Sequence, residues 1–272
     1  DPLGGATLYT AIGFFFGFAV GNLGQPHMLH KFYMLDDPRK LKWLPLVIGS
    51  TQTLCVLIWL GIGLAVPGLV AAGKLAPLAR PDEASPTFLL TFAPEMLAGL
   101  VFAGILAAIM STADSFVNIG AAAVVHDLPK ALRRKIPNEL LWGRVAVLGV
   151  AITAAVFAHL YGDLIALLGT FAFGTFGAAL APAVAVGLNW RRVTRQAAIA
   201  SIAIGMGSNL TLEFMSKQSF WPALPRPPMA EGVLPAAVAL AASFATLFVV
   251  TWLTDRRSRQ VVPPEVVAVM EI

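Results

Sequence analysis

Long apolar runs constrain the fold of this chain more than any other feature. The hydrocarbon core of a bilayer is about 30 Å thick, and a helix of about 20 apolar residues crosses it. Seven candidate spans follow one another along the chain: Leu3–Leu23, Leu44–Val70, Met96–Val125, Leu140–Leu160, Leu164–Leu188, Ala197–Phe214 and Val233–Leu253. The sequence therefore predicts an all-α polytopic membrane protein with about seven transmembrane helices.

The balance of residue types supports this prediction. Apolar residues make up 57% of the 272 residues and charged residues only 12%, which is about half the charged share of a soluble globular chain. The single cysteine, Cys55, lies inside the second run, so a disulfide framework is excluded. The lipid bilayer is the partner that this composition predicts.

The distribution of basic residues predicts an orientation. If the runs alternate across the bilayer, fifteen of the nineteen Lys and Arg residues fall in loops on one side. Because cytoplasmic loops carry the excess of bases, we expect the N-terminus outside and the C-terminus in the cytoplasm, as in a bacterial-type inner (plasma) membrane. This distribution explains the net charge of +4 without nucleic acid, since no aromatic residues interleave with the bases.

No soluble domain boundary interrupts the chain. We expect residues 1–272 to form a single transmembrane domain, with residues 255–272 as a cytoplasmic tail. Asp1 is not an initiator Met and no signal peptide follows it, so we expect a missing N-terminal half of the same protein as a partner. We also expect a short surface helix at Thr87–Phe92, and Pro129 and Pro137 to close the helices beside a basic loop.

The first run has two features of its own. Gly13, Gly17 and Gly21 form a stripe of small residues at helical spacing, which lets another helix approach closely. At the end of the run, Gly24-Gln25-Pro26-His27 places a proline where it breaks the helical hydrogen-bond ladder. Broken helices at membrane depth are tolerated against protein or a water-lined cavity.

Chemistry-bearing residues concentrate in the third run. Ala108, Ser111, Thr112 and Ser115 are spaced i, i+3, i+4, i+7 and share one helix face, and Asp114 lies beside it. Hydroxyl and carbonyl oxygens suit a partly dehydrated Na⁺ ion, and a carboxylate adds negative charge. The alternative is that the hydroxyls only bond to carbonyls one turn earlier. From the residues alone, the two interpretations stand near parity.

Other motifs do not indicate catalysis. The chain has no phosphate-binding glycine loop, no zinc-ligand spacing and no nucleophile elbow. We therefore expect no enzyme activity, no cofactor and no metal other than Na⁺ as a coupling ion.

Five segments resemble the sodium/solute symporter family, with the sodium–proline type nearest. They are Gly24–His27, Phe102–Ser115, Val124–Lys130, Trp142–Leu148 and Phe176–Ala198. The resemblance covers essentially the whole chain in the family's order. It implies the second inverted repeat of the LeuT fold for the first five runs, core helices six to ten, followed by two C-terminal helices.

The resemblance also implies roles for individual residues. Ser111 and Thr112 match the paired hydroxyls that ligate sodium, and Ala108 matches the carbonyl contributor one turn earlier. Asp114 and Ser115 match positions where some relatives hold a second sodium.

For the solute, the resemblance implies a pocket around Phe18, Asn22 and Pro26, with Phe171 and Phe173 as secondary candidates. Sodium–proline carriers have a Trp at the position of Asn22 and a Tyr at the position of Phe18. The identity of the solute therefore stays open.

The function that follows is sodium-coupled symport of a small organic solute such as an amino acid or carboxylate. Two alternatives remain from the sequence. One is the membrane sensor domain of a signalling protein, which the short tail after Asp255 disfavours. The other is a proton-coupled carrier that uses Asp114 and ignores sodium.

Overall fold

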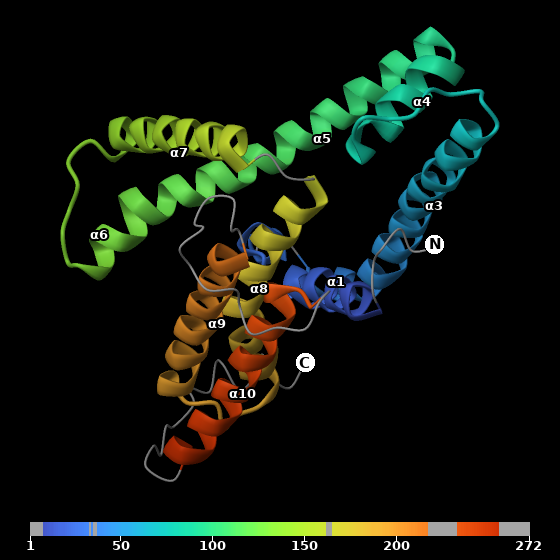
Figure 1. Cartoon of the computed structure of the whole chain (residues 1–272). Helices are drawn as coiled ribbons and strands as arrows, with labels where there is room; N and C mark the ends of the chain where they lie inside the picture. The colour runs from blue at the N-terminus through green and yellow to red at the C-terminus, as the bar shows by residue number, and fades with distance from the viewer. Residues whose placement is uncertain (1–7, 33, 35–36, 162–164, 217–232, 256–272) are drawn as a thin grey trace. The chain divides into compact units, whose positions relative to one another are not determined.

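The computed structural model describes residues 8–32, 34, 37–161, 165–216 and 233–255, and these residues contain helices and no strands (Figure 1). The α-helices are α1 Leu8–Gly21, α2 Pro26–Phe32, α3 Leu44–Ala71, α4 Ala84–Phe92, α5 Glu95–Ala122, α6 Leu128–Ala131, α7 Glu139–Tyr161, α8 Ile165–Asn189, α9 Arg195–Ser216 and α10 Pro235–Asp255. Short 3-10 turns occupy η1 Asn22–Gly24, η2 Pro38–Trp43 and η3 Pro81–Glu83, and η4 Ala123–Asp127 is a π-turn.

Six of the seven predicted spans are confirmed as helices long and apolar enough to cross a membrane: α3, α5, α7, α8, α9 and α10. The short helix predicted at the surface is α4. The chain is therefore an all-helical polytopic membrane protein. The predicted tail after residue 255 lies outside the described residues.

The first predicted run differs from the others because it is short and broken. α1 and η1 together end at Gly24, Gln25 adopts an extended conformation, and Pro26 begins α2. The backbone N–H of Gln25 still donates to the carbonyl of Asn22 at 3.2 Å. The break predicted at Pro26 is confirmed, because proline has no N–H to continue the ladder.

The prediction that Pro129 closes the third helix is wrong. α5 runs through the π-turn η4 into α6, and the helix ends only at Ala131. A proline ring clashes with the carbonyl four residues earlier in a regular α-helix. The wider π-turn directly before Pro129 relieves that conflict, so the chain stays helical for one further turn.

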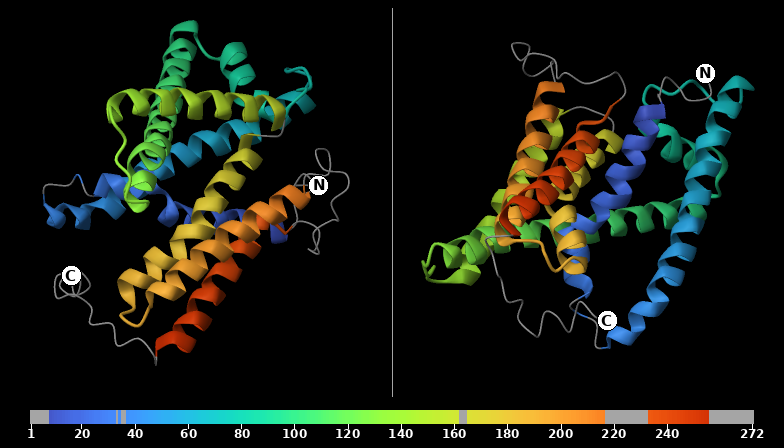
Figure 2. Two further views of the ribbon diagram at one scale, coloured as in Figure 1. Left: turned by 90° about the vertical axis from the view of Figure 1, so that its left-hand side faces the viewer. Right: turned by 90° about the horizontal axis from the view of Figure 1, so that it is seen from below.

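The chain divides into two compact units. Unit 1 contains residues 1–33 and 166–272, and unit 2 contains residues 34–165. In unit 1, α8, α9 and α10 lie side by side (Figure 2). α9 and α10 are antiparallel. Thr194, which precedes α9, is hydrogen-bonded at 2.7 Å to Thr254, near the end of α10.

Small residues hold unit 1 together at close range. A side-chain carbon at Gly21 would lie 3.1 Å from the carbonyl oxygen of Phe173, and one at Gly177 would lie 2.6 Å from the Cα of Gly21. Gly13 and Gly17 face Leu234 and Ala236. The predicted stripe of glycines is therefore confirmed as a packing surface, and it faces α8 and α10.

Unit 2 is an open assembly of α3, α4, α5 and α7. α7 crosses α5 and contacts it (Figure 2), with Gly120 of α5 against Val150 of α7. Few residues in the apolar stretches of these helices are buried within the described part of the chain. The buried share is 6% in α3, 6% in α5 and 0% in α7. These apolar faces are suited to a non-aqueous surrounding.

Candidate functional site

The predicted oxygen stripe lies in the middle of α5. Thr112 donates its hydroxyl proton to the carbonyl of Ala108 at 3.0 Å, and Ser115 donates to the carbonyl of Ser111 at 2.9 Å. Ala108, Ser111 and Thr112 are all exposed in unit 2. The hydroxyls of Thr112 and Ser115 thus bond to carbonyls one turn earlier, as the alternative interpretation expects.

The bond from Thr112 is also made by threonines elsewhere. Thr153 on α7 donates to the carbonyl of Gly149 at 2.8 Å, in the same i to i−4 pattern. Such a bond uses the hydroxyl proton and leaves the oxygen lone pairs available to a cation. It also places two oxygens of Ala108 and Thr112 side by side. The geometry is thus common to a structural threonine and to a sodium ligand, and the ligand role stays a prediction.

Asp114 has a partner on its own helix. Its Oδ1 accepts a hydrogen bond from Nδ2 of Asn118 at 2.9 Å, and both side chains are exposed. The amide contact orients the carboxylate along α5 without neutralising it. The negative charge expected beside the stripe is therefore held one turn from Ser111.

The predicted solute residues come together in part. Phe18 of α1 stacks on Phe173 of α8, with ring centroids 5.1 Å apart and an interplanar angle of 28°. Pro26 begins α2 and is half-buried, whereas Asn22 in η1 is exposed. Phe171 is half-buried on α8. The structure thus brings one pair of the predicted aromatic residues together, from α1 and α8.

Sequence reasoning missed Gln25, which lies at the break itself. The residue is fully buried. Its Nε2 donates to the carbonyl of Gly21 at 3.4 Å, and its Oε1 has no hydrogen-bond partner among the described residues. A buried acceptor without a partner is costly, and such groups often mark functional positions. Its place between Gly24 and Pro26 was the available signal.

The break is fixed by the approach of α8. A side-chain carbon at Gly24 would collide with the backbone of Phe176 and Gly177. Glycine is required there because two backbones meet without intervening side chains. Gln25 is therefore held against α8.

Metal ligands of the usual kind do not gather in the described part of the chain, where no group of three or more His, Cys, Asp or Glu residues could hold a metal ion. An ion held by hydroxyl and carbonyl oxygens would leave no such cluster. The oxygen stripe and the helix break are therefore the two candidate sites.

Comparisons with known proteins find one family. The model of the sodium:solute symporter family matches residues 6–205. The sodium/proline symporter of Haemophilus influenzae is 33% identical over 196 residues, covering 68% of this chain and 38% of that protein. The sodium/proline symporter of Escherichia coli is 32% identical over 206 residues, covering 72% and 40%.

A high-affinity proline transporter of Bacillus subtilis is 29% identical over 204 residues, covering 70% of this chain and 41% of that protein. The chain thus spans about two fifths of the length of these curated relatives. No solved structure matches it. Both candidate sites lie inside the segment that the family model matches.

Proposed function

The chain belongs to the sodium:solute symporter family, and from that membership we propose that it is part of a secondary active transporter that couples sodium entry to uptake of a small organic solute. The observation that carries the proposal is the family match over residues 6–205. Relatives whose names specify sodium and proline support sodium as the coupling ion and an amino acid as the class of solute.

The proposed sodium ligands are the hydroxyls of Ser111 and Thr112 and the carbonyl of Ala108. The family match over residues 6–205 supports this set, and the back-bond of Thr112, which brings a hydroxyl and a carbonyl oxygen together at 3.0 Å, is compatible with it. Asp114 and Ser115 are the proposed ligands of a second sodium. The amide of Asn118 occupies one carboxylate oxygen of Asp114 and orients the other, which supports this role.

The proposed solute site surrounds the break after η1. Aromatic surface from Phe18 and Phe173 would cover the apolar part of the solute, with Phe171 as a secondary contact, and Pro26 and Asn22 would border it. The Oε1 of Gln25, which has no partner among the described residues, would accept a hydrogen bond from the solute's ammonium or imino group. Relatives named for proline make a small zwitterionic amino acid the first solute to test.

The proposed mechanism is alternating access in a bacterial plasma membrane, with the C-terminus in the cytoplasm. Sodium on the α5 stripe would stabilise the outward-open arrangement and raise solute affinity. Reciprocal coupling of this kind is worth roughly 1–3 kcal/mol. The membrane potential adds roughly 2.3 kcal/mol per charge for each 100 mV.

The test is uptake of labelled amino acids by the full-length protein in proteoliposomes. We expect accumulation only under an inward sodium gradient, with sodium raising apparent solute affinity by roughly 5–150-fold. Replacing sodium with choline is the control.

Uptake driven by a pH gradient in sodium-free buffer would contradict sodium coupling and favour a proton-coupled carrier. A protein that binds a solute at saturating sodium and never accumulates it would favour the sensor alternative.

A further inference from the structure

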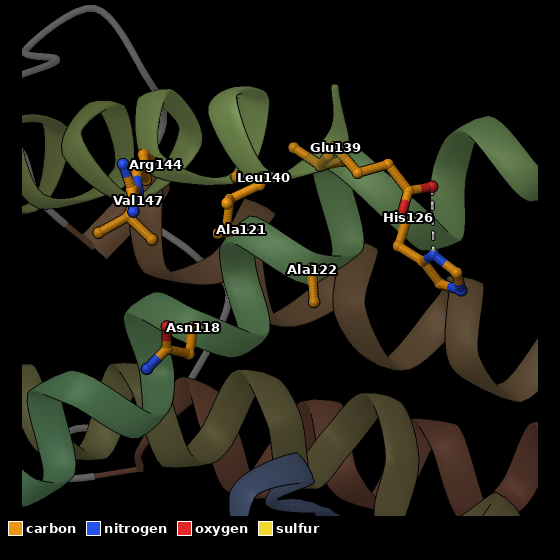
Figure 3. A pocket seen from close by; sticks show the side chains of 10 residues that line it. Asn118, Ala121, Ala122, His126, Glu139, Leu140, Arg144 and Val147 are labelled. Atoms are coloured by element: carbon orange, nitrogen blue, oxygen red, sulfur yellow. Dashed lines mark ion pairs between the residues drawn. The ribbon is translucent and has the colours of Figure 1, made fainter. Parts of the chain in front are cut away.

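A cavity of about 710 Å³ lies in unit 2 between the end of α5, the π-turn η4 and the start of α7 (Figure 3). Its lining includes none of the proposed sodium or solute ligands, although Asn118 in its wall also donates to Asp114 on α5 at 2.9 Å. Its size falls in the range of small-molecule sites, which is roughly 300–1,000 Å³.

Small residues and two contacts between helices create the cavity. α5 and α7 touch at Gly120 and Val150, and His126 approaches Glu139 at 3.8 Å (Figure 3). Between these contacts the walls are formed by Ala121, Ala122 and Gly143, and no atom lies within 4 Å of where a side-chain carbon at Gly143 would be. The short side chains leave the space between the helices unfilled.

The polar groups of the cavity are unevenly distributed. Arg144 and Asn118 line it as donors, and Glu139 is paired with His126. The side walls are apolar, with Leu140 and Val147 on α7. An amphiphile whose charged end meets Arg144 and whose apolar part follows Leu140 and Val147 matches this arrangement.

The segment that connects the two helices of the cavity is basic. The segment 127–144 holds five bases against the two acids Asp127 and Glu139. The bases are Lys130, Arg133, Arg134, Lys135 and Arg144.

The start of this loop is a defined turn. Arg133 is in the left-handed region with φ of 53°, and the N–H of Arg134 donates to the carbonyl of Pro129 at 2.8 Å. Such a turn closes the end of the helix before the basic loop.

The end of α7 that borders the cavity has the character of a membrane interface. Trp142 is 50% exposed and Leu140 is 73% exposed within the first turn of α7. Tryptophan is enriched where headgroups meet hydrocarbon, and basic pockets between membrane helices bind anionic headgroups. The net positive charge of segment 127–144 favours an anionic headgroup.

We propose that this cavity binds the headgroup of an anionic glycerophospholipid, with the phosphate on Arg144 and Asn118 and the acyl chains passing over Leu140 and Val147. The His126–Glu139 pair closes the end nearest the loop. The site requires neither sodium nor solute, so its test is independent of transport.

The test is lipid retention by the full-length protein, measured by native mass spectrometry after incubation with phosphatidylglycerol or phosphatidylcholine at equal concentration. We expect preferential retention of phosphatidylglycerol and a fall of about fivefold in Arg144→Gln. Glu139→Gln should retain the lipid as well as wild type or better, because it removes a negative charge from the site. Arg195→Gln, which loses the same charge at an exposed position on α9, is the matched control.

Equal losses in Arg144→Gln and Arg195→Gln would overturn the proposal, since they would show diffuse attraction. Equal retention of both lipids, or displacement of phosphatidylglycerol by inorganic phosphate, would overturn it as well. Ala122→Leu narrows the cavity without changing its charge, and it provides a second test of lipid binding if Arg144→Gln does not fold. Unchanged retention in Ala122→Leu would show that the lipid binds elsewhere or that another part of the protein fills the cavity.

Discussion

At the scale of single residues, identical local bonds occur in different surroundings. Thr112 and Thr153 both donate to the carbonyl four residues earlier. Only Thr112 has a second hydroxyl beside it and a carboxylate two residues on, from Ser111 and Asp114. The sequence could predict the oxygen stripe because helical spacing alone determines which residues share a face. It could not decide whether an ion completes the stripe, since that depends on oxygens from other segments.

Gln25 shows the opposite case, because its burial identifies it as a candidate functional residue. In the sequence, only its place between Gly24 and Pro26 distinguishes this glutamine. Its importance comes from the close approach of α8, which removes water from Oε1 without replacing the lost hydrogen bond. That contact joins residues more than 140 positions apart, so local patterns could not predict it.

Substituting Gln25 separates its structural and functional roles. Gln25→Leu removes a buried acceptor that has no partner in the described part of the chain, and such a group costs about 1–3 kcal/mol. We therefore expect a free energy of unfolding equal to or above that of wild type, measured by thermal unfolding of the purified full-length protein. We also expect the apparent solute KM to rise about tenfold or more, because hydrogen bonds to charged groups contribute about 1.5–3 kcal/mol.

Asn209→Leu is the control for Gln25→Leu. Asn209 is also a fully buried amide whose Oδ1 has no partner among the described residues, but it lies on α9 and donates to Thr175 at 2.8 Å. This variant should leave the solute KM unchanged. A wild-type KM in Gln25→Leu would remove Gln25 from the solute site.

At the scale of helices, unit 1 depends on close contacts between backbones and small side chains. α9 buries Ala197, Ser201, Gly205 and Asn209 at four-residue spacing. Ser201 and Ser243 bond each other at 2.9 Å across α9 and α10. The sequence could predict α9 as a helix despite its polar residues. It could not predict that those residues face α8 and α10, because no periodic signal identifies the partner.

Two glycines on α9 provide a direct test of this packing. A side-chain carbon at Gly205 would collide with the backbone of Ala178 and lie 2.8 Å from Oγ of Ser243, whereas Gly207 has open space. We expect Gly205→Ala to lower the free energy of unfolding in detergent by about 1–3 kcal/mol, as overpacking does. Gly207→Ala should be neutral or stabilising by up to about 1 kcal/mol, because alanine favours helix.

Denaturant titrations of the two variants measure both effects. Equal stability of Gly205→Ala and Gly207→Ala would show that α8, α9 and α10 do not meet at this point.

At the scale of the whole molecule, the apolar runs and the basic loops predict spans and orientation, because both depend on composition over many residues. Six spans and the helix break are confirmed, whereas the orientation stays a prediction. The single-domain prediction is likewise untested. The helices of unit 2 expose large apolar side chains such as Leu64 and Met110, which lipid or the rest of the transporter would cover.

The proposed function is a property of a longer protein, because the chain spans about two fifths of the length of its relatives. Symport needs two solvent-accessible arrangements of the whole transporter, and the α5 stripe would supply the sodium ligands for one of them. Sodium coupling through α5 therefore depends most on whether the Thr112 hydroxyl binds sodium or only bonds to the carbonyl of Ala108 in its own helix.

The most direct measurement is the sodium dependence of solute uptake by the full-length protein carrying Thr112→Ala or Thr153→Ala. Both substitutions remove the same hydroxyl and the same back-bond, from α5 and α7 respectively. We predict that Thr112→Ala raises the apparent KM for sodium about tenfold, equivalent to ~1.4 kcal/mol. Thr153→Ala should leave this KM unchanged. A wild-type KM for sodium in Thr112→Ala, or equal changes of this KM in the two variants, would contradict sodium binding by Thr112.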